Sequence, residues 1–275
     1  MKSLLKKIRI GIICGPYLLY CYFAWIRPYS SHPDKYPLEL RYKRARKLIL
    51  VILSHLCGDF KVENKPILDT EESKFFVANH VNMLDPLMLV AFSPKPVCFI
   101  AKKETEKLPF VGRIIKALGG IFLDRDDPRQ AIRVFQIAMK NIQEKTAHVA
   151  IFPEGTRNHH PYEHDLKEFH PGSFKIAQRT NTPITPVAIF GTFSLMKSNT
   201  LYHRYLVQVS FLDEIPASIF NEKKNPEIAV EVRDLVQQKF VELRDNDVAY
   251  YKEKKYKGKT AKWWKDENIV EKYEK

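Results

Sequence analysis

The sequence predicts an α/β protein with a mostly parallel mixed sheet flanked by helices, and with an N-terminal membrane-associated helix pair. From residue 74 onward, short apolar runs alternate with helical patterns, which is typical of strands joined by crossover helices. Before that point, an uncharged stretch of 17 residues, 10–26, lies between clusters of basic residues. The composition, 45% hydrophobic and 28% charged, is that of a globular chain and excludes a disordered one.

The N-terminal apolar stretch is short for a transmembrane helix. At about 1.5 Å per residue it extends about 25 Å, less than the roughly 30 Å of a hydrocarbon core. Basic residues flank both of its ends, whereas a spanning helix concentrates them on one side. A second apolar run, 48–57, is shorter still. We therefore expect two helices that dip into one leaflet of the cell membrane, with a single short span as the alternative.

This monotopic arrangement would keep the rest of the chain on the cytoplasmic side. A signal peptide is not expected, because no small-residue cleavage site follows the apolar stretch. Aromatic side chains of this stretch are expected at the membrane interface. They are Tyr17, Tyr20, Tyr22, Trp25 and Tyr29.

The net charge of +13 is confined to the two ends of the chain. Residues 1–47 contain 11 basic and 2 acidic residues, and residues 248–275 contain 9 and 5, whereas the middle is neutral. A nucleic-acid-binding protein usually carries its basic residues on the folded domain that contacts the ligand. Basic ends around a neutral body favour an anionic membrane surface as partner rather than nucleic acid. Solubilising tails are the simpler alternative.

Three regions follow from these patterns: membrane-associating helices in 1–60, an α/β domain in 61–247, and a basic aromatic tail in 248–275. Strands are expected at 75–78, 97–101, 120–123, 149–152, 184–190 and 206–211. Helices are expected at 86–91, 110–118, 128–144, 173–179 and 226–244. Functional residues of such sheets gather in the loops that follow the strands.

The first such loop contains His80 and Asp85, directly after an apolar strand. A carboxylate that accepts a hydrogen bond from one imidazole nitrogen holds that nitrogen protonated, which leaves the other nitrogen free to take a proton from a hydroxyl. His80 and Asp85 are therefore a candidate base and its orienting group. The alternative for Asp85 is a helix N-cap, because proline follows it, and the same alternative applies to Asp127.

Two further loops carry cationic side chains. Arg125 ends the run G-G-I-F-L-D-R, and the sequence F-P-E-G-T-R from Phe152 to Arg157 follows the next strand. In the second, Gly155 permits backbone angles that bring N–H groups close to a ligand, Thr156 adds a hydroxyl, and Arg157 adds a cationic fork. This loop suits an anion. Glu154 is expected to fix Arg157 or to bind a substrate hydroxyl.

Together with the apolar run 184–187, these motifs resemble the glycerolipid acyltransferases, and most closely the lysophosphatidate acyltransferases. The resemblance rests on N-H-x-x-x-x-D at 79–85, G-x-I-F-x-D-R at 119–125 and F-P-E-G-T-R at 152–157, in the family's order. It covers about residues 74–190 and includes K-K-E at 102–104. Leu123 is a small departure from the second motif.

The resemblance implies a reaction and roles for residues. His80 would act as general base on the hydroxyl of lysophosphatidate, and Asp85 would orient it. Glu154, Gly155, Thr156 and Arg157 would bind the acceptor, with Arg125, Lys102 and Lys103 as further phosphate contacts. The acyl donor would be a thioester of acyl carrier protein or coenzyme A. Acyl transfer would be direct, because neither G-x-S-x-G nor a cysteine stands near these motifs.

Neither a metal nor a cofactor is expected. His160 and His164 have a spacing that zinc sites on helices use, but Pro161 lies between them and no H-E-x-x-H motif is present. The four cysteines lack a C-x-x-C pair, which indicates a reducing compartment. The alternatives in function are the same fold acting on glycerol-3-phosphate or on a lysophospholipid, and a non-catalytic membrane-binding protein.

Overall fold

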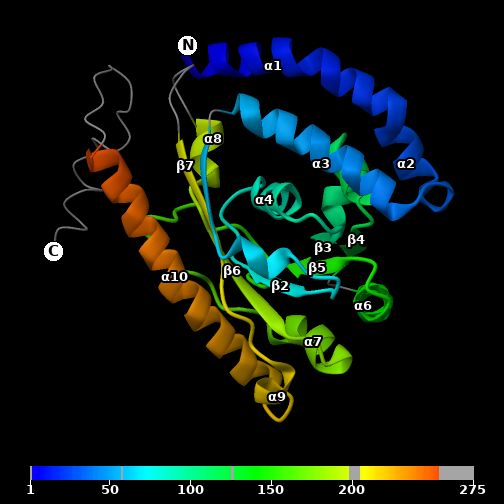
Figure 1. The fold of residues 1–275 in the computed structure, drawn as a ribbon, viewed down its shortest axis with the longest axis vertical. Helices are drawn as coiled ribbons and strands as arrows, with labels where there is room; N and C mark the ends of the chain where they lie inside the picture. Colours follow the sequence, from blue (N-terminus) through cyan, green and yellow to red (C-terminus); the bar gives the residue numbers. More distant parts are fainter. Residues whose placement is uncertain (1, 57, 125–126, 198–204, 254–275) are drawn as a thin grey trace.

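A computed structural model describes residues 2–56, 58–124, 127–197 and 205–253. The chain forms three layers, in which a seven-stranded sheet lies between two groups of helices (Figure 1). The predicted α/β architecture with a mostly parallel mixed sheet is confirmed.

The sheet has the strand order β1-β7-β6-β2-β5-β3-β4. Its strands are β1 (Gly58–Glu63), β2 (Phe75–Ala78), β3 (Val97–Lys102), β4 (Ile121–Leu123), β5 (His148–Ile151), β6 (Ile184–Phe190) and β7 (Tyr205–Phe211). Strands β2 to β6 are parallel, whereas β7 pairs antiparallel to β6 and parallel to β1. The carboxyl ends of β2, β3, β4, β5 and β6 therefore meet at one edge, where the motif-bearing loops lie.

The first helical layer covers one face of the sheet. It consists of α3 (Leu38–His55), α4 (Asp85–Phe92) and α5 (Val111–Ala117). Their apolar side chains form one core with the sheet, to which Leu48, Met88 and Phe76 contribute fully buried side chains. Burial of this apolar surface is the main force that holds the layer in place.

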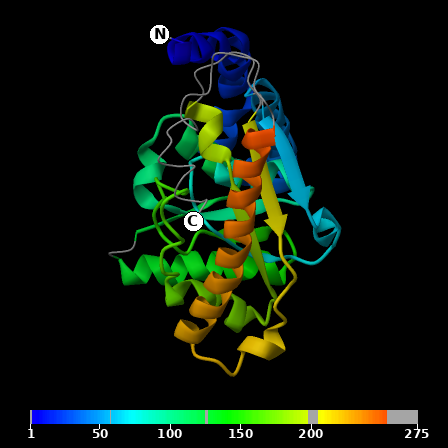
Figure 2. The ribbon, with the colours of Figure 1, turned by 90° about the vertical axis from the view of Figure 1, so that its left-hand side faces the viewer.

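The second helical layer covers the opposite face. It consists of α6 (Pro128–Gln143), α7 (Lys175–Thr180), the single-turn α9 (Ala217–Phe220) and the long α10 (Asn225–Glu253). Asp127 caps α6 through hydrogen bonds from the N–H groups of Arg129 and Gln130, as its place before proline predicts. Figure 2 shows α10 running along the outside of the domain, from α9 toward β7. The buried side chains of Val236, Phe240 and Leu243 attach α10 to this face.

The N-terminal segment is a nearly continuous helix: α1 (Lys2–Cys21), a π-helical turn (Tyr22–Ile26) and α2 (Arg27–Ser31). It lies beside α3, so a helix pair is present (Figure 1). Among the described residues, no helix is long and apolar enough to cross a bilayer. Trp25 and Tyr29 are buried in the domain core, so these two side chains are not the interfacial aromatics that the sequence predicted.

Two elements differ from the sequence-based expectation. Strand β1 was not predicted. Among the described residues it pairs with β7 alone, and most of its side chains are half-exposed, so it lacks a long apolar run. Helix α10 continues to Glu253, six residues into the region predicted as a tail, while residues 254–275 lie outside the described residues. Smaller elements of the described residues are α8 (Thr192–Lys197) after β6 and four 3-10 turns, Pro33–Lys35, Lys65–Leu68, Lys103–Lys107 and Pro171–Phe174.

A buried histidine makes the stability of this fold sensitive to acid. His148 begins β5, where its Nδ1 atom accepts the N–H of Lys74 at 2.9 Å and its side chain is inaccessible to solvent. Burial, with Lys95 and Lys74 nearby, lowers the pKa of His148 to about 3. The folded protein therefore holds this imidazole neutral, whereas the unfolded chain protonates it near pH 6.5.

We expect the free energy of unfolding to fall as pH drops from 6.5 toward 3, because only the unfolded chain gains this proton. The His148→Asn variant keeps a side-chain acceptor for Lys74 but does not titrate, so its loss should be smaller by on the order of a few kcal/mol. Urea unfolding at several pH values measures both proteins. Parallel pH dependences would contradict this account.

Candidate active site

The site is built around His80, which follows β2 at the carboxyl edge of the sheet. Its Nδ1 atom lies 2.8 Å from Oδ2 of Asp85, within hydrogen-bonding distance. His80 is half-buried, and its ring packs against Phe152 with centroids 4.5 Å apart. The two residues that the sequence paired are therefore in contact.

Asp85 is fully buried, and its carboxylate accepts several hydrogen bonds. Oδ2 also accepts the N–H groups of Val81 and Asn82, both at 2.7 Å, and Oδ1 accepts the hydroxyl of Thr192 at 2.5 Å. These donors offset the cost of burying a carboxylate. Because the carboxylate acts as acceptor throughout, His80 donates through Nδ1 and keeps the Nε2 lone pair.

Asp85 is not the N-cap of α4, which was the alternative reading of its sequence. Leu84 occupies the cap position, and no side chain caps this helix. Asp85 is the first helical residue, and its side chain turns back toward the loop rather than onto the helix end. Pro86 follows Asp85 in the first turn of the helix, where the backbone nitrogen has no partner within the helix and the missing N–H of proline costs nothing.

Asn79 joins the loop to the neighbouring strand. Its Nδ2 atom donates to the carbonyl of Ile189, and its Oδ1 atom accepts the N–H of the same residue, at 2.9 and 2.7 Å. This double contact fixes the end of β2 against β6. It also brings Thr192, two residues beyond β6, to the carboxylate of Asp85.

Glu154 lies beneath the site, with 3% of its surface exposed. Its Oε1 atom accepts the N–H of His80 at 2.7 Å, and its Oε2 atom accepts the N–H of Lys167 at 3.1 Å. Burial raises the pKa of the Glu154 carboxyl, while these two donors act in the opposite direction. In this structure, both carboxylate oxygens are engaged by the protein backbone.

The F-P-E-G-T-R turn becomes exposed toward its end. Gly155 has a φ of +68°, a left-handed conformation that glycine adopts without strain, and its N–H closes the turn onto Phe152. Thr156 and Arg157 are exposed. The turn thus places a hydroxyl and a guanidinium where an anionic ligand has access to both.

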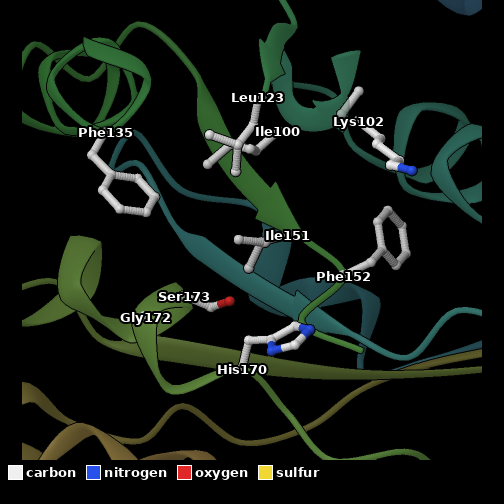
Figure 3. A pocket seen from close by; sticks show the side chains of 10 residues that line it. Ile100, Lys102, Leu123, Phe135, Ile151, Phe152, His170, Gly172 and Ser173 are labelled. Atoms are coloured by element: carbon white, nitrogen blue, oxygen red, sulfur yellow. The ribbon is translucent and has the colours of Figure 1, made fainter. Parts of the chain in front are cut away.

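A mostly apolar pocket of about 210 Å³ is lined by residues of β3, β4 and β5 and of segment 170–173 (Figure 3). Ile100, Leu123 and Phe135 contribute apolar side chains, and Lys102 and His170 contribute polar groups. The remaining lining residues are Ala101, Ile151, Phe152, Gly172 and Ser173. Phe152 lines the pocket and its ring also packs against His80, so this one side chain connects the pocket to the imidazole.

The lysines predicted to contact the phosphate, Lys102 and Lys103, pair with different acidic residues. Lys102 lines the pocket and forms an ion pair with Glu104 at 3.1 Å. Lys103 binds Asp124 at 2.8 Å, and this contact raises the pKa of the lysine. Arg125 lies outside the described residues, so its role stays a prediction.

The histidine-rich segment forms no metal cluster in the part of the chain that the structure describes. The rings of His160 and His164 lie 5.5 Å apart on an exposed turn. The sequence predicts a loop near the acceptor-phosphate site for this segment, and His170, four residues before Phe174, lines the pocket.

The arrangement has elements that proton transfer to and from a hydroxyl group requires: an imidazole, a carboxylate in contact with it, and an exposed turn that carries a hydroxyl and a guanidinium. The chain belongs to the Acyltransferase family, whose sequence model matches residues 59–190.

Two curated relatives show the same kinship. The chain is 33% identical to the "Probable 1-acyl-sn-glycerol-3-phosphate acyltransferase" of Mycoplasma genitalium, over 77% of this chain and 79% of that protein. It is 29% identical to the 1-acyl-sn-glycerol-3-phosphate acyltransferase of Escherichia coli, over 69% and 76% of the two chains. The predicted family is confirmed.

The fold also matches a solved structure, the 1-acyl-sn-glycerophosphate acyltransferase PlsC from Thermotoga maritima. The TM-score is 0.66 at 24% identity, and the match covers 89% of this chain and 98% of that one. This likeness supports the three-layer architecture.

The sequence analysis did not identify Thr192. This residue follows an apolar strand, and nothing in the local sequence marks its hydroxyl as a partner of Asp85. The Thr192→Val variant keeps the shape but removes the donor, leaving a buried carboxylate oxygen unpaired at a cost of about 1–3 kcal/mol. We expect its kcat/KM for acyl transfer to fall about tenfold or more. Thr192→Ser should retain most activity.

The control is Thr180→Val, which removes a hydroxyl bonded to the carbonyl of Ile176 on α7. Steady-state rates of thiol release measure all three variants. Equal activity in Thr192→Val and Thr180→Val would show that the hydroxyl of Thr192 does not support the site.

Proposed function

We propose that this chain transfers a fatty acyl group from a thioester to the free hydroxyl of 1-acyl-sn-glycerol-3-phosphate, producing phosphatidate for phospholipid synthesis. The observation that carries the proposal is the contact between His80 and Asp85, set beside an apolar pocket and an anion-binding turn. The names of the curated relatives support the choice of acceptor.

In this mechanism His80 takes the proton of the acceptor hydroxyl on Nε2 as the oxygen attacks the thioester carbonyl. The new ester bond forms, the carbon–sulfur bond breaks, and the departing thiolate takes the proton from Nε2. Asp85 stabilises the imidazolium that exists between these steps, because its carboxylate accepts the hydrogen bond from the Nδ1–H group throughout. No acyl-enzyme intermediate is required.

The acceptor phosphate is proposed to contact Arg157, Thr156 and the N–H groups near Gly155, with Lys102, Lys103 and Arg125 as further cations. Glu154 supports this turn and His80 through the backbone contacts described above. A bidentate guanidinium contact fixes a phosphate in orientation as well as in place, which brings the hydroxyl to His80. The thioester donor is carried by acyl carrier protein or by coenzyme A.

We expect His80→Ala and Asp85→Asn to lower kcat by about 10² to 10⁴, the usual contribution of a positioned base, while binding of lysophosphatidate is retained. His32→Ala, a change at an exposed histidine before α3, is the control. Thiol release is measured with acyl-carrier-protein and coenzyme A donors against lysophosphatidate, glycerol-3-phosphate and a lysophospholipid. Normal turnover in both site variants would contradict the mechanism, and preference for another acceptor would contradict the substrate.

We also propose that the N-terminal helix pair holds the enzyme on the cytoplasmic face of the cell membrane without spanning it. Ile12, Leu19, Tyr20 and Phe23 of this segment are each more than half exposed, so they are available to an apolar phase. On α3, Lys43, Arg44 and Lys47 are exposed and would meet anionic headgroups.

The double variant Leu19→Glu/Phe23→Glu should bind anionic vesicles at least about tenfold more weakly, because both apolar contacts are lost. The matched control is Ile132→Glu/Ile137→Glu on α6, which changes two exposed apolar side chains outside the helix pair. Co-sedimentation at low salt and at about 1 M salt separates apolar from electrostatic binding. Equal binding by the two double variants would contradict the proposed contact.

A further inference from the structure

The segment 157–170 holds both backbone polar groups of His80, one of them through Glu154. The segment begins at Arg157, the last residue of the F-P-E-G-T-R turn, and contains no helix or strand. The N–H of Asn158 donates to the carbonyl of His80 at 2.7 Å, and the N–H of Lys167 donates to Glu154, which in turn accepts the N–H of His80. The position of the histidine backbone therefore depends on this segment.

The outer side of the same segment is attached to α10. The N–H of Leu166 donates to Oε1 of Gln237 at 2.8 Å, and the hydroxyl of Tyr162 donates to Asp247. Gln237 and Asp247 lie ten residues apart, which places them within about 80° of each other around the helix. Arg244 adds a third polar contact, to Oδ1 of Asp165 at 3.5 Å, so α10 makes three directed contacts with a segment that has no regular structure of its own.

Leu166 and Lys167 are consecutive residues, and their backbone N–H groups donate to different partners. One N–H is held from outside by α10, and the next is held from inside by Glu154, one hydrogen bond away from His80. A displacement of Leu166 moves Lys167 with it, because the two residues share a rigid peptide unit. This pair of amides connects α10 to the backbone of the proposed base.

The polar contacts are not needed to attach α10 to the sheet. Its apolar side chains, including Val236 and Phe240, already bury the helix against the domain. Asp247 is fully buried, and its Oδ1 atom has no hydrogen-bond partner among the described residues. Burial of this unpaired oxygen lowers the free energy of unfolding. A buried polar group kept at such a cost favours a role in holding a defined geometry.

We propose that Gln237 and Asp247 are positioning residues for acyl transfer, and that α10 holds segment 157–170 so that the segment holds His80 and Glu154. The inference rests on the proposed function for its rate measurement only. Helix α10 lies beyond residues 59–190, the part of the chain that matches the family, so the site would depend on a helix outside the matched domain.

The test replaces the acceptor for Leu166. Gln237→Leu removes the acceptor at similar size, Gln237→Glu restores an acceptor oxygen, and Gln238→Leu changes the exposed neighbouring residue of α10. We expect Gln237→Leu to lower kcat about tenfold with the donor KM changed less than about twofold, since small displacements at a site lower rates without loss of binding. Gln237→Glu should recover most of the rate, and Gln238→Leu should match the unaltered protein.

Hydrogen exchange of backbone amides provides a second readout that does not depend on activity. In Gln237→Leu, exchange at the amides of Leu166, Lys167 and His80 should accelerate, whereas in Gln238→Leu it should not. Tyr162→Phe tests the second anchor and should accelerate exchange in the same segment. Because exchange needs no substrate, it distinguishes failure of this inference from failure of the proposed function.

A lower melting temperature in Gln237→Leu, with unchanged kcat per folded enzyme and unchanged exchange at His80, would overturn the proposal and leave Gln237 a purely structural residue. Unchanged exchange at His80 with a lowered kcat would also overturn it, because the route through Lys167 and Glu154 would then be wrong.

Discussion

The buried carboxylate of Asp85 is the constraint on which the site depends. A carboxylate with no solvent contact is tolerated only when donors surround it, and here they come from His80, from two backbone N–H groups of the same loop, and from Thr192 after β6. The loop, the start of α4 and the end of β6 therefore take the positions that satisfy this one group. The orientation of the imidazole follows from the same contacts.

Much of the fold could be predicted from the sequence, because its central strands are fully buried and read as continuous apolar runs. Strand β1 could not be, since an edge strand paired on one side carries no such run and is defined only by its partner β7. Helix α10 was predicted to end at residue 244, yet it continues to Glu253, because nothing in the charged stretch after residue 244 breaks a helix.

The candidate site was predictable where residues are close in sequence and not where the fold brings them together. His80 and Asp85 share one loop, so their spacing indicated the pair. Thr192 and Gln237 contact residues 107 and 71 positions away in the sequence, and neither has a local pattern that marks it. Glu154 was assigned to Arg157 or a substrate on charge grounds, whereas in the structure its oxygens accept backbone N–H groups, which no sequence pattern encodes.

The order of these parts along the chain has a consequence for synthesis of the protein. The helix pair α1–α3 emerges from the ribosome first, while β6, Thr192 and α10 emerge last. The nascent chain therefore presents its exposed apolar face before the contacts around Asp85 can form. Long-range contacts of this kind form late and slowly. A chain that stops before α10 would thus carry segment 157–170, and the His80 loop that this segment contacts, without the helix that holds the segment.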